Sequence, residues 1–333
     1  MTLPKRIAVT LPAGPKLEHS IALIKWAEEQ GFDDGWYADA GAPDSLTQLA
    51  AIGHHTQTLR LGVAVTPVYT RTPAVLAATA DVISQVLPGR FVMGLGSSSH
   101  AIVGGWHGIP LEKPLTRVKE TAQIVKSMLA GEKSNFSLDT LNSRGYRQPP
   151  CENPPPIYLA ALRAKMLEMA AEVGEGVIIN LWPQGALPKM LEHIRIGAER
   201  AGKSVADVEV VNRAMVLVTD DKANARDIFR ASFGPYYATP VYNKFLAWAG
   251  YEEAAAAIRE GWAAKDRDKT AAAMSDKMID EIAVIGTADE VRDRINADAE
   301  TGVHTQIIAP MAASIEDAMR TLSAFSKDQF SYS

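Results

Sequence analysis

The sequence is poor in the residues on which metal, disulfide and nucleic-acid-binding proteins depend. Its one cysteine, Cys151, cannot form an internal disulfide and has no histidine at ligand spacing, so a bystander thiol is favoured over a nucleophile or a metal ligand. The seven histidines include no H-x-H or H-x-x-x-H pair, so no histidine metal site is predicted. The net charge is −5 and no block of basic residues is interleaved with aromatics, which argues against nucleic acid as a partner.

Long apolar runs are also missing. No run is long enough to span a bilayer, and residues 1–6 lead into a strand rather than into the apolar core of a signal peptide. We therefore expect a cytoplasmic protein without membrane contact. The 47% hydrophobic content of the 333 residues supports a large core, and nothing in the composition indicates disorder.

Apolar strand patterns alternate regularly with helical patterns along the chain, which is the arrangement of a parallel sheet. The eight expected strands lie in residues 6–10, 34–39, 59–72, 90–100, 157–161, 176–180, 208–218 and 305–309. The helices expected between them lie at about residues 17–30, 45–55, 73–86, 115–129, 163–173, 185–201 and 289–300. Eight such units predict a (β/α)8 TIM barrel, with residues 1–333 as a single domain. A doubly wound open sheet is the alternative, and the absence of a G-x-G-x-x-G turn after the first strand counts against it.

Two segments are longer than a barrel needs. Residues 131–156 show no helical period and predict a functional or lid insertion after strand four. Residues 221–278 are rich in alanine and predict the helix after strand seven together with a helical insertion, at about 235–280, between strands seven and eight. Residues 282–285 are either an extra strand or a buried apolar turn. The breaks expected inside the alanine-rich segment are at residues 234–235, 240 and 250.

Small and polar residues gather where the expected strands end, and parallel barrels carry their ligand sites at these carboxyl ends. Asp39 follows strand two and either accepts a hydrogen bond from a ligand or caps the next segment. After strand three, Ala64 leaves room for a flat ring, while Thr66 and Arg71 supply a hydroxyl and a fixed positive charge. A simpler interpretation is that the flanking prolines only end the strand and start the helix. That interpretation does not explain the density of donors between them.

Strand four ends in Gly96, Ser97 and Ser98, followed closely by His100. Glycine permits close backbone approach, and serine hydroxyls can bind phosphate or ring carbonyl oxygens. A plain transition from strand to loop explains the motif about as well. The His100 imidazole is a candidate acid or base, with a solvated loop histidine as the alternative.

The helix after strand five opens with Arg163 and Lys165. Free N–H groups and two cations at a helix start make a phosphate site, whereas a merely solvated basic first turn would oppose the helix dipole. With no metal set and no Ser-His-Asp triad in the sequence, the strand ends suit a large phosphorylated cofactor that performs its own chemistry. Trp106, Trp182 and Tyr69 are either the walls of a pocket or ordinary core filling.

Three stretches together resemble the luciferase-like monooxygenase superfamily of flavin- and deazaflavin-dependent barrels. They are TPVYTRTPAVLA at residues 66–77, LPGRFVMGLGS at 87–97, and PIYLAALRAKMLEMAAE at 156–172. The resemblance covers nearly the whole chain. Residues 36–47, WYADAGAPDSLT, are similar to the branch of the superfamily that uses the deazaflavin coenzyme F420.

The resemblance implies that Asp39 lies beside the cofactor ring and that the peptide between Ala64 and Val65 is a non-prolyl cis bond behind the ring. The turn expected to meet the phosphate departs from the family, because it reads Leu-Arg-Ala at residues 162–164 where many relatives have Gly-Pro or Gly-Gly. Sugar-phosphate dehydrogenases of this branch carry a catalytic glutamate after the strand-four glycines, and none stands at residues 98–100. The implied cofactor contacts are Asp39, Ala64, Val65, Thr66, Gly96, Ser97, Ser98, Ala161, Leu162 and Arg163.

The activity that the resemblance implies is hydride transfer between carbon C5 of F420 and a small organic substrate, with His100 or Asp39 managing the accompanying proton. A deazaflavin favours two-electron hydride chemistry over reaction with oxygen. One alternative is an FMN-dependent monooxygenase that receives reduced flavin from a separate reductase. The other is a non-catalytic protein that binds flavin or deazaflavin. A homodimer is also implied.

Overall fold

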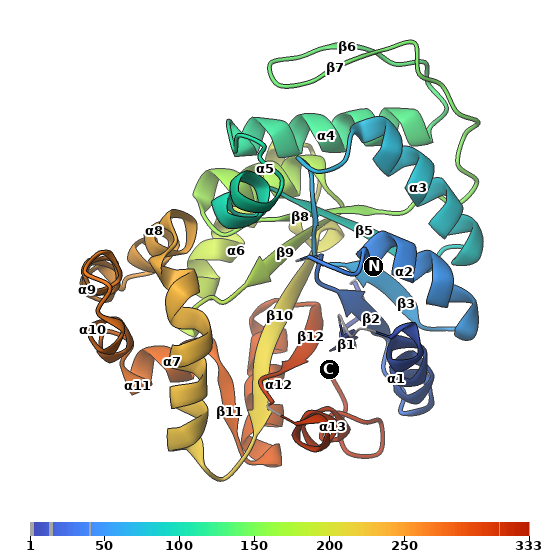
Figure 1. The fold of residues 1–333 in the computed structure, drawn as a ribbon. Helices are drawn as coiled ribbons and strands as arrows, with labels where there is room; N and C mark the ends of the chain where they lie inside the picture. Colours follow the sequence, from blue (N-terminus) through green and yellow to red (C-terminus); the bar gives the residue numbers. More distant parts are fainter. Residues whose placement is uncertain (1–2, 13–15, 40, 313, 333) are drawn as a thin grey trace.

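The computed structural model describes residues 3–12, 16–39, 41–312 and 314–332, and its centre is a closed barrel of parallel strands (Figure 1). Strand β1 pairs with β2 on one side and with β12 on the other, and β10 pairs with both β9 and β12, so the sheet closes on itself. The predicted (β/α)8 barrel is confirmed, and the open doubly wound sheet is excluded. The barrel strands are β1 (Arg6–Thr10), β2 (Asp34–Tyr37), β3 (Arg60–Val63) continued by β4 (Thr66–Pro67), β5 (Phe91–Gly96), β8 (Ile157–Ala160), β9 (Gly176–Asn180), β10 (Glu209–Val218) and β12 (Thr305–Pro310).

Helices follow the strands and surround the barrel (Figure 1). Local capping explains several helix starts: the Asp44 carboxylate accepts from the Thr47 N–H at 2.7 Å, and Thr287 and Glu290 form a capping box. The surrounding helices are α1 (Leu17–Glu29), α2 (Ser45–Ile52), α3 (Pro73–Val86), α4 (Pro114–Leu129), α5 (Ala164–Val173), α6 (Leu187–Arg200), α7 (Lys222–Ala238), α12 (Ala288–Thr301) and α13 (Ile315–Ser323). The short turns of helix are η1 (Gly53–His55), η2 (Ala101–Trp106), η3 (Gln184–Ala186) and η4 (Val205–Asp207). No helix in the described ranges combines the length and apolarity needed to cross a bilayer.

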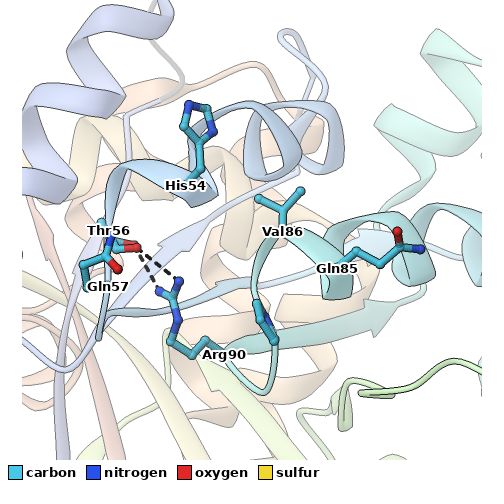
Figure 2. A pocket seen from close by; sticks show the side chains of 7 residues that line it. His54, Thr56, Gln57, Gln85, Val86 and Arg90 are labelled. Atoms are coloured by element: carbon cyan, nitrogen blue, oxygen red, sulfur yellow. Dashed lines mark hydrogen bonds between the residues drawn. The ribbon is translucent and has the colours of Figure 1, made fainter.

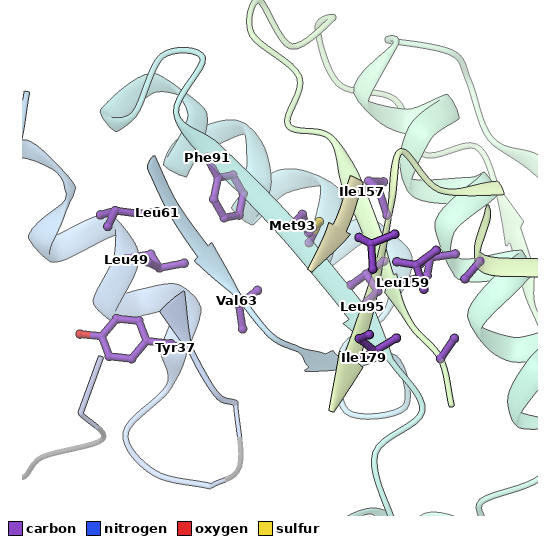
Figure 3. Packing of buried hydrophobic residues seen from close by; sticks show 14 of the residues in the cluster. Tyr37, Leu49, Leu61, Val63, Phe91, Met93, Leu95, Ile157, Leu159 and Ile179 are labelled. Atoms are coloured by element: carbon purple, nitrogen blue, oxygen red, sulfur yellow. The ribbon is translucent and has the colours of Figure 1, made fainter. Parts of the chain in front are cut away.

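Side chains alternate between the two faces of each strand, because successive residues of a strand point to opposite sides. Leu61, Val63, Met93 and Leu159 face outward and pack beneath the helices (Figure 3). The residues between them face inward and fill the middle of the barrel. This inner layer consists of Ala8, Trp36, Val92, Tyr158, Ile178, Val211 and Ile307.

A buried ionic network closes the amino-terminal end of the barrel. The Arg60 guanidinium donates to the Asp34 carboxylate at 2.6 Å and to the Glu209 carboxylate at 2.7 Å. Glu209 also accepts hydrogen bonds from the hydroxyls of Tyr158 and Thr305. Because these residues stand at or near the first positions of five different strands, the network ties the barrel together at the end opposite the expected ligand site.

The segment expected to be a functional or lid insertion contains a hairpin, β6 (Asn135–Ser137) and β7 (Asn142–Arg144), which lies along α4 (Figure 1). The Glu120 carboxylate of α4 accepts from the N–H groups of Asp139 and Thr140, both at 2.9 Å. The hairpin is therefore held against the outer helix.

The alanine-rich segment forms α7 followed by α8 (Pro240–Trp248), α9 (Glu252–Ala263), α10 (Arg267–Ala272) and α11 (Asp276–Ile282). The expected breaks at Pro240 and Gly250 are confirmed. The break predicted at residues 234–235 is wrong: α7 continues through Pro235 for three more residues and ends at Ala238. Residues 284–286 form the extra strand β11 (Val284–Gly286), parallel to the end of β10.

Candidate functional site

The barrel widens at its carboxyl end because the inward-facing side chains there are small. Above the layer of Trp36 and Tyr158, the inner positions hold Ala64, Gly94 and Ala160. Ala64 and Ala160 are partly exposed although they lie inside a barrel. These positions therefore form a floor on which a ligand can rest.

Strand three bulges at the predicted place. The peptide bond between Ala64 and Val65 is cis, as the family resemblance implies, and the strand resumes at Thr66, which pairs with Leu95 of β5. The bulge dictates the glycines of β5: a Cβ on Gly94 would lie 1.9 Å from the Val63 carbonyl oxygen. Sequence and backbone are thus matched over two neighbouring strands.

A second glycine accommodates the same bulge. A Cβ on Gly96 would lie 2.5 Å from Cγ2 of Val65 and 3.1 Å from the Cβ of Ala160. Real Cβ atoms do not approach other heavy atoms within 3.0 Å, so residue 96 must remain glycine unless the bulge moves. Close contacts with the bulge therefore explain both glycines, Gly94 and Gly96, at the end of β5.

Asp39 lies at the end of β2 and is nearly buried, with 6% of its side chain exposed. Burial raises the pKa of its carboxyl, and the charge of Arg71, which donates to Asp39 at 2.9 Å, acts against that rise. The Thr66 hydroxyl lies near enough to lower the same pKa, although it does not meet hydrogen-bond geometry. Arg71 also pairs with Asp44, the cap of α2. The cap of α2 is therefore Asp44 and not Asp39.

The loop after β5 turns back across the mouth. Ser98 has a left-handed backbone, with φ of 60°, and His100 is exposed at the start of the turn η2. The Trp106 side chain at the end of η2 is 61% exposed, and its ring lies 3.4 Å from the position of a Cβ on Gly41. The loops after β2 and β5 therefore meet at Trp106.

The other two aromatic candidates are core residues. Trp182 is buried and its indole N–H donates to the Asn212 side chain at 2.8 Å. Tyr69 is buried and its hydroxyl donates to the Glu112 carbonyl. Only Trp106 of the three keeps an exposed face in the part of the chain that is described.

The start of α5 has the arrangement expected of a phosphate site. Ala161 is buried, Leu162 is half-buried, and Arg163 is exposed in an extended conformation immediately before the helix. No side chain caps the helix start, so the first-turn N–H groups remain available to an anion.

Two polar residues on the far side of the mouth were not anticipated from the sequence. Asn180 ends β9, and Arg213 of β10 is its register partner. The signal was present, because an arginine interrupts the apolar pattern VVNRAMVLV of β10 at an inward position.

Four polar atoms at the carboxyl ends of the strands are buried without a hydrogen-bond partner among the described residues. They are the hydroxyls of Thr10 and Thr66, Oδ1 of Asn180 and Nε of Arg213. Unpaired buried polar atoms are costly, and the four at the carboxyl ends of the strands are positioned to pair with a polar ligand there. This end therefore fits a large polar ring system: a small-residue floor, unpaired donors and acceptors around it, and an open helix start beside it.

A surface depression of about 510 Å³ lies elsewhere, between the end of α2 and the turn from α3 to β5 (Figure 2). The Arg90 guanidinium at its edge donates to the hydroxyl and the carbonyl of Thr56, both at 3.1 Å. Arg90 directly precedes β5, so this depression lies at the amino-terminal end of the barrel. The Arg90 guanidinium is already occupied by hydrogen bonds to the protein's own backbone.

Comparisons with known proteins agree with this geometry. The family model of the luciferase-like monooxygenases matches residues 1–305. A 5,10-methylenetetrahydromethanopterin reductase of Methanolobus tindarius is 32% identical over 319 residues, covering 94% of this chain and 96% of that protein. A putative coenzyme F420-dependent oxidoreductase of Mycobacterium tuberculosis is 27% identical over 327 residues, covering 90% of this chain and 93% of that protein. The solved structure of the coenzyme F420-dependent tetrahydromethanopterin reductase from Methanopyrus kandleri has the same fold, with a TM-score of 0.83, 21% identity, and coverage of 98% of this chain and 100% of that chain.

Proposed function

The chain belongs to the luciferase-like monooxygenase family, and on that premise we propose that it is a coenzyme F420-dependent oxidoreductase that transfers a hydride between the deazaflavin and a small organic substrate. The observation that carries the proposal is the floor of Ala64, Gly94 and Ala160 behind the cis bulge, ringed by unpaired polar atoms. When bound, F420 supplies a carbon that accepts or donates a hydride.

The residues present fit such a cofactor. Ala64 and Val65 would support one face of the ring, and a larger side chain at residue 94 or 96 would displace them. Thr66 offers a buried hydroxyl without a partner to the ring edge. Gly96, Ser97 and Ser98 would follow the ring and the ribityl chain.

The open start of α5 would hold the phosphate. Ala161 and Leu162 bring the backbone to the mouth, and Arg163 adds a positive charge beside the uncapped N–H groups. A backbone site of this kind does not require the glycines that many relatives carry.

Asp39 would hold a proton at its carboxyl; burial raises the pKa of this carboxyl, and the charge of Arg71 acts against that rise. His100 is exposed on the opposite loop and would exchange a proton with solvent. Trp106, which joins the two loops, would exclude water from the ring face.

The test is a binding titration of the purified protein with F420 and, separately, with FMN, followed by absorbance. We expect saturable F420 binding that is at least about tenfold tighter than FMN binding. Preference for FMN would favour the monooxygenase alternative, and binding of neither would refute the proposal. F420 binding without turnover across a broad set of alcohols, aldehydes and imines would favour the non-catalytic alternative.

A matched pair of variants tests the role of Asp39. Asp39→Asn is expected to weaken F420 binding or slow turnover by about 10- to 100-fold, the usual effect of losing a charged hydrogen-bonding group. Asp44→Asn is the control, because asparagine also caps helices and Asp44 belongs to α2. Equal effects in the two variants would show that the Arg71 pair is structural.

We also propose that the protein is a homodimer of one-domain chains, as its family resemblance implies. Val75 and Val82 of α3 support this, since both are about half exposed and stand seven residues apart on one helix face. Sedimentation equilibrium of the wild type and of a Val75→Glu, Val82→Glu variant would test it, with a monomeric wild type as the contrary result.

A further inference from the structure

Arg213 is an arginine inside the barrel without a carboxylate to pair with. Alternation along β10 places it on the inward face with Glu209 and Val211, one layer nearer the mouth. None of the ion pairs formed by the described residues includes it, and its Nε is buried with no hydrogen-bond partner. The contact printed for its Nη1 is a weak one with the Met215 sulfur at 3.8 Å. Arg213 is partly buried, and leaving its buried Nε without an acceptor costs stability, so the residue needs a reason to be there.

The strand neighbour of Arg213 is Asn180, which lacks a hydrogen-bond donor where Arg213 lacks an acceptor. Asn180 lies opposite Arg213 in the register of β9 and β10, so the two side chains project side by side. The Asn180 amide nitrogen donates to the Tyr242 hydroxyl at 3.1 Å, which leaves Oδ1 buried without a donor. Nε of Arg213, a cationic donor, and Oδ1 of Asn180, a neutral acceptor, therefore belong to adjacent side chains, and neither atom has a hydrogen-bond partner among the described residues.

Tyrosines of α7 and α8 cover Arg213 and Asn180 on the outer side. Tyr242 of α8 packs edge-on against Tyr236 and Tyr237 of α7, at ring distances of 5.8 and 6.0 Å. The Tyr237 hydroxyl donates to the Leu181 carbonyl at 2.8 Å, which fastens α7 to the end of β9. Tyr236 is about half exposed. The pair thus lies in an aromatic-walled recess on the side of the mouth opposite Asp39, where the end of β9 runs beside β8 and the segment that leads into α5.

We propose that Arg213 binds a carboxylate of the substrate while Asn180 accepts a hydrogen bond from a neighbouring hydroxyl or amine, so that the substrate is a hydroxy- or amino-substituted organic acid. This rests on the proposed function, because it names the substrate class of that same site. The cofactor's phosphate is accounted for separately by the start of α5.

The experiment measures binding of four probes, lactate, mandelate, lactamide and propionate, by calorimetry, to the protein with and without F420. We expect lactate and mandelate to bind, and Arg213→Met to weaken both by at least about tenfold while lactamide binding is unchanged. Arg213→Lys should restore part of the affinity. Asn180→Ala should weaken lactate more than propionate, which has no hydroxyl.

A stability measurement separates this role from a structural one. Removing an unpaired buried charge should raise the melting temperature of Arg213→Met above that of the wild type, whereas loss of a structural arginine would lower it. Arg117→Met is the control: its Nε is also buried without a partner, but it lies on α4, and carboxylate binding should not change.

Three results would overturn the inference. They are failure of both hydroxy acids to bind the wild type, equal loss of lactate and lactamide in Arg213→Met, and a loss of F420 affinity in that variant as large as the loss of carboxylate affinity. The last result would show that Arg213 binds an anionic group of the cofactor rather than a carboxylate of the substrate. The F420 titration of the wild type is independent of these measurements, so a failure of the proposed function is seen separately.

Discussion

The ionic network at the base of the barrel yields a quantitative prediction about stability and pH. Glu209 is buried, which by itself would raise the pKa of its carboxyl. The hydrogen bond and charge of Arg60, with the hydroxyls of Thr305 and Tyr158, outweigh burial and lower that pKa from 4.5 to about 2. Each pKa unit corresponds to ~1.4 kcal/mol, so the charged form of Glu209 contributes about 3 kcal/mol to the free energy of unfolding.

This contribution has a defined pH range. Because the pKa in the folded state lies below that in the unfolded chain, the contribution is fully present above about pH 4.5 and is lost as the pH falls toward 2. Glu209→Gln removes it. We therefore expect the variant to be destabilised by about 3 kcal/mol at pH 7, with the difference from the wild type shrinking below pH 4.5.

The assay is urea unfolding of both proteins at pH 7, 5, 4 and 3, followed by circular dichroism. Glu199→Gln is the control, because Glu199 pairs with Arg195 on the exposed face of α6 and its loss should leave the urea midpoint unchanged. An unchanged midpoint for Glu209→Gln at pH 7 would contradict the assignment of this network. So would a wild-type advantage that persists in full at pH 3.

Three further predictions concern the mouth of the barrel. Gly94→Ala should abolish F420 binding, because its Cβ would overlap the Val63 carbonyl, whereas Gly105→Ala, with open space around it, should bind normally; absorbance titration of both folded variants decides this. Arg71→Met should shift the pH midpoint of F420 binding upward, because the Arg71 charge holds down the pKa of Asp39; a downward shift would contradict that pairing. Trp106→Ala should increase the rate at which F420 dissociates, as measured by stopped-flow absorbance, without changing the melting temperature, because the exposed Trp106 ring joins the loops over the site.

Local patterns predicted most of the strands and helices because each element is specified by residues close in sequence. The hairpin at residues 135–144 was missed, since its short polar strands are held by the Glu120 carboxylate of α4 rather than by an apolar pattern of their own. The continuation of α7 through Pro235 was also missed, since the glycine and proline at residues 234–235 predict a break.

The candidate site was predictable in part. The resemblance located the cis peptide between Ala64 and Val65, which the structure confirms. The roles of Asp39 and His100, and the cofactor contacts of residues 96–98 and 161–163, stay predictions. Arg213 and Asn180 were overlooked, because whether a polar residue is paired depends on neighbours that the local sequence does not name.

By itself, the sequence determined the order of strands and helices, the end of the sheet where small and polar residues gather, and the family, because all three depend on residue types at short spacing. Only the tertiary structure decided what closure of the barrel brings together. Arg60 and Glu209 stand 149 positions apart, yet they share one ionic network at the base. At the mouth, the same closure places Arg213 beside Asn180 and leaves it without a counter-charge. The register between strands that are distant in sequence decides which charged side chains find a partner within the protein.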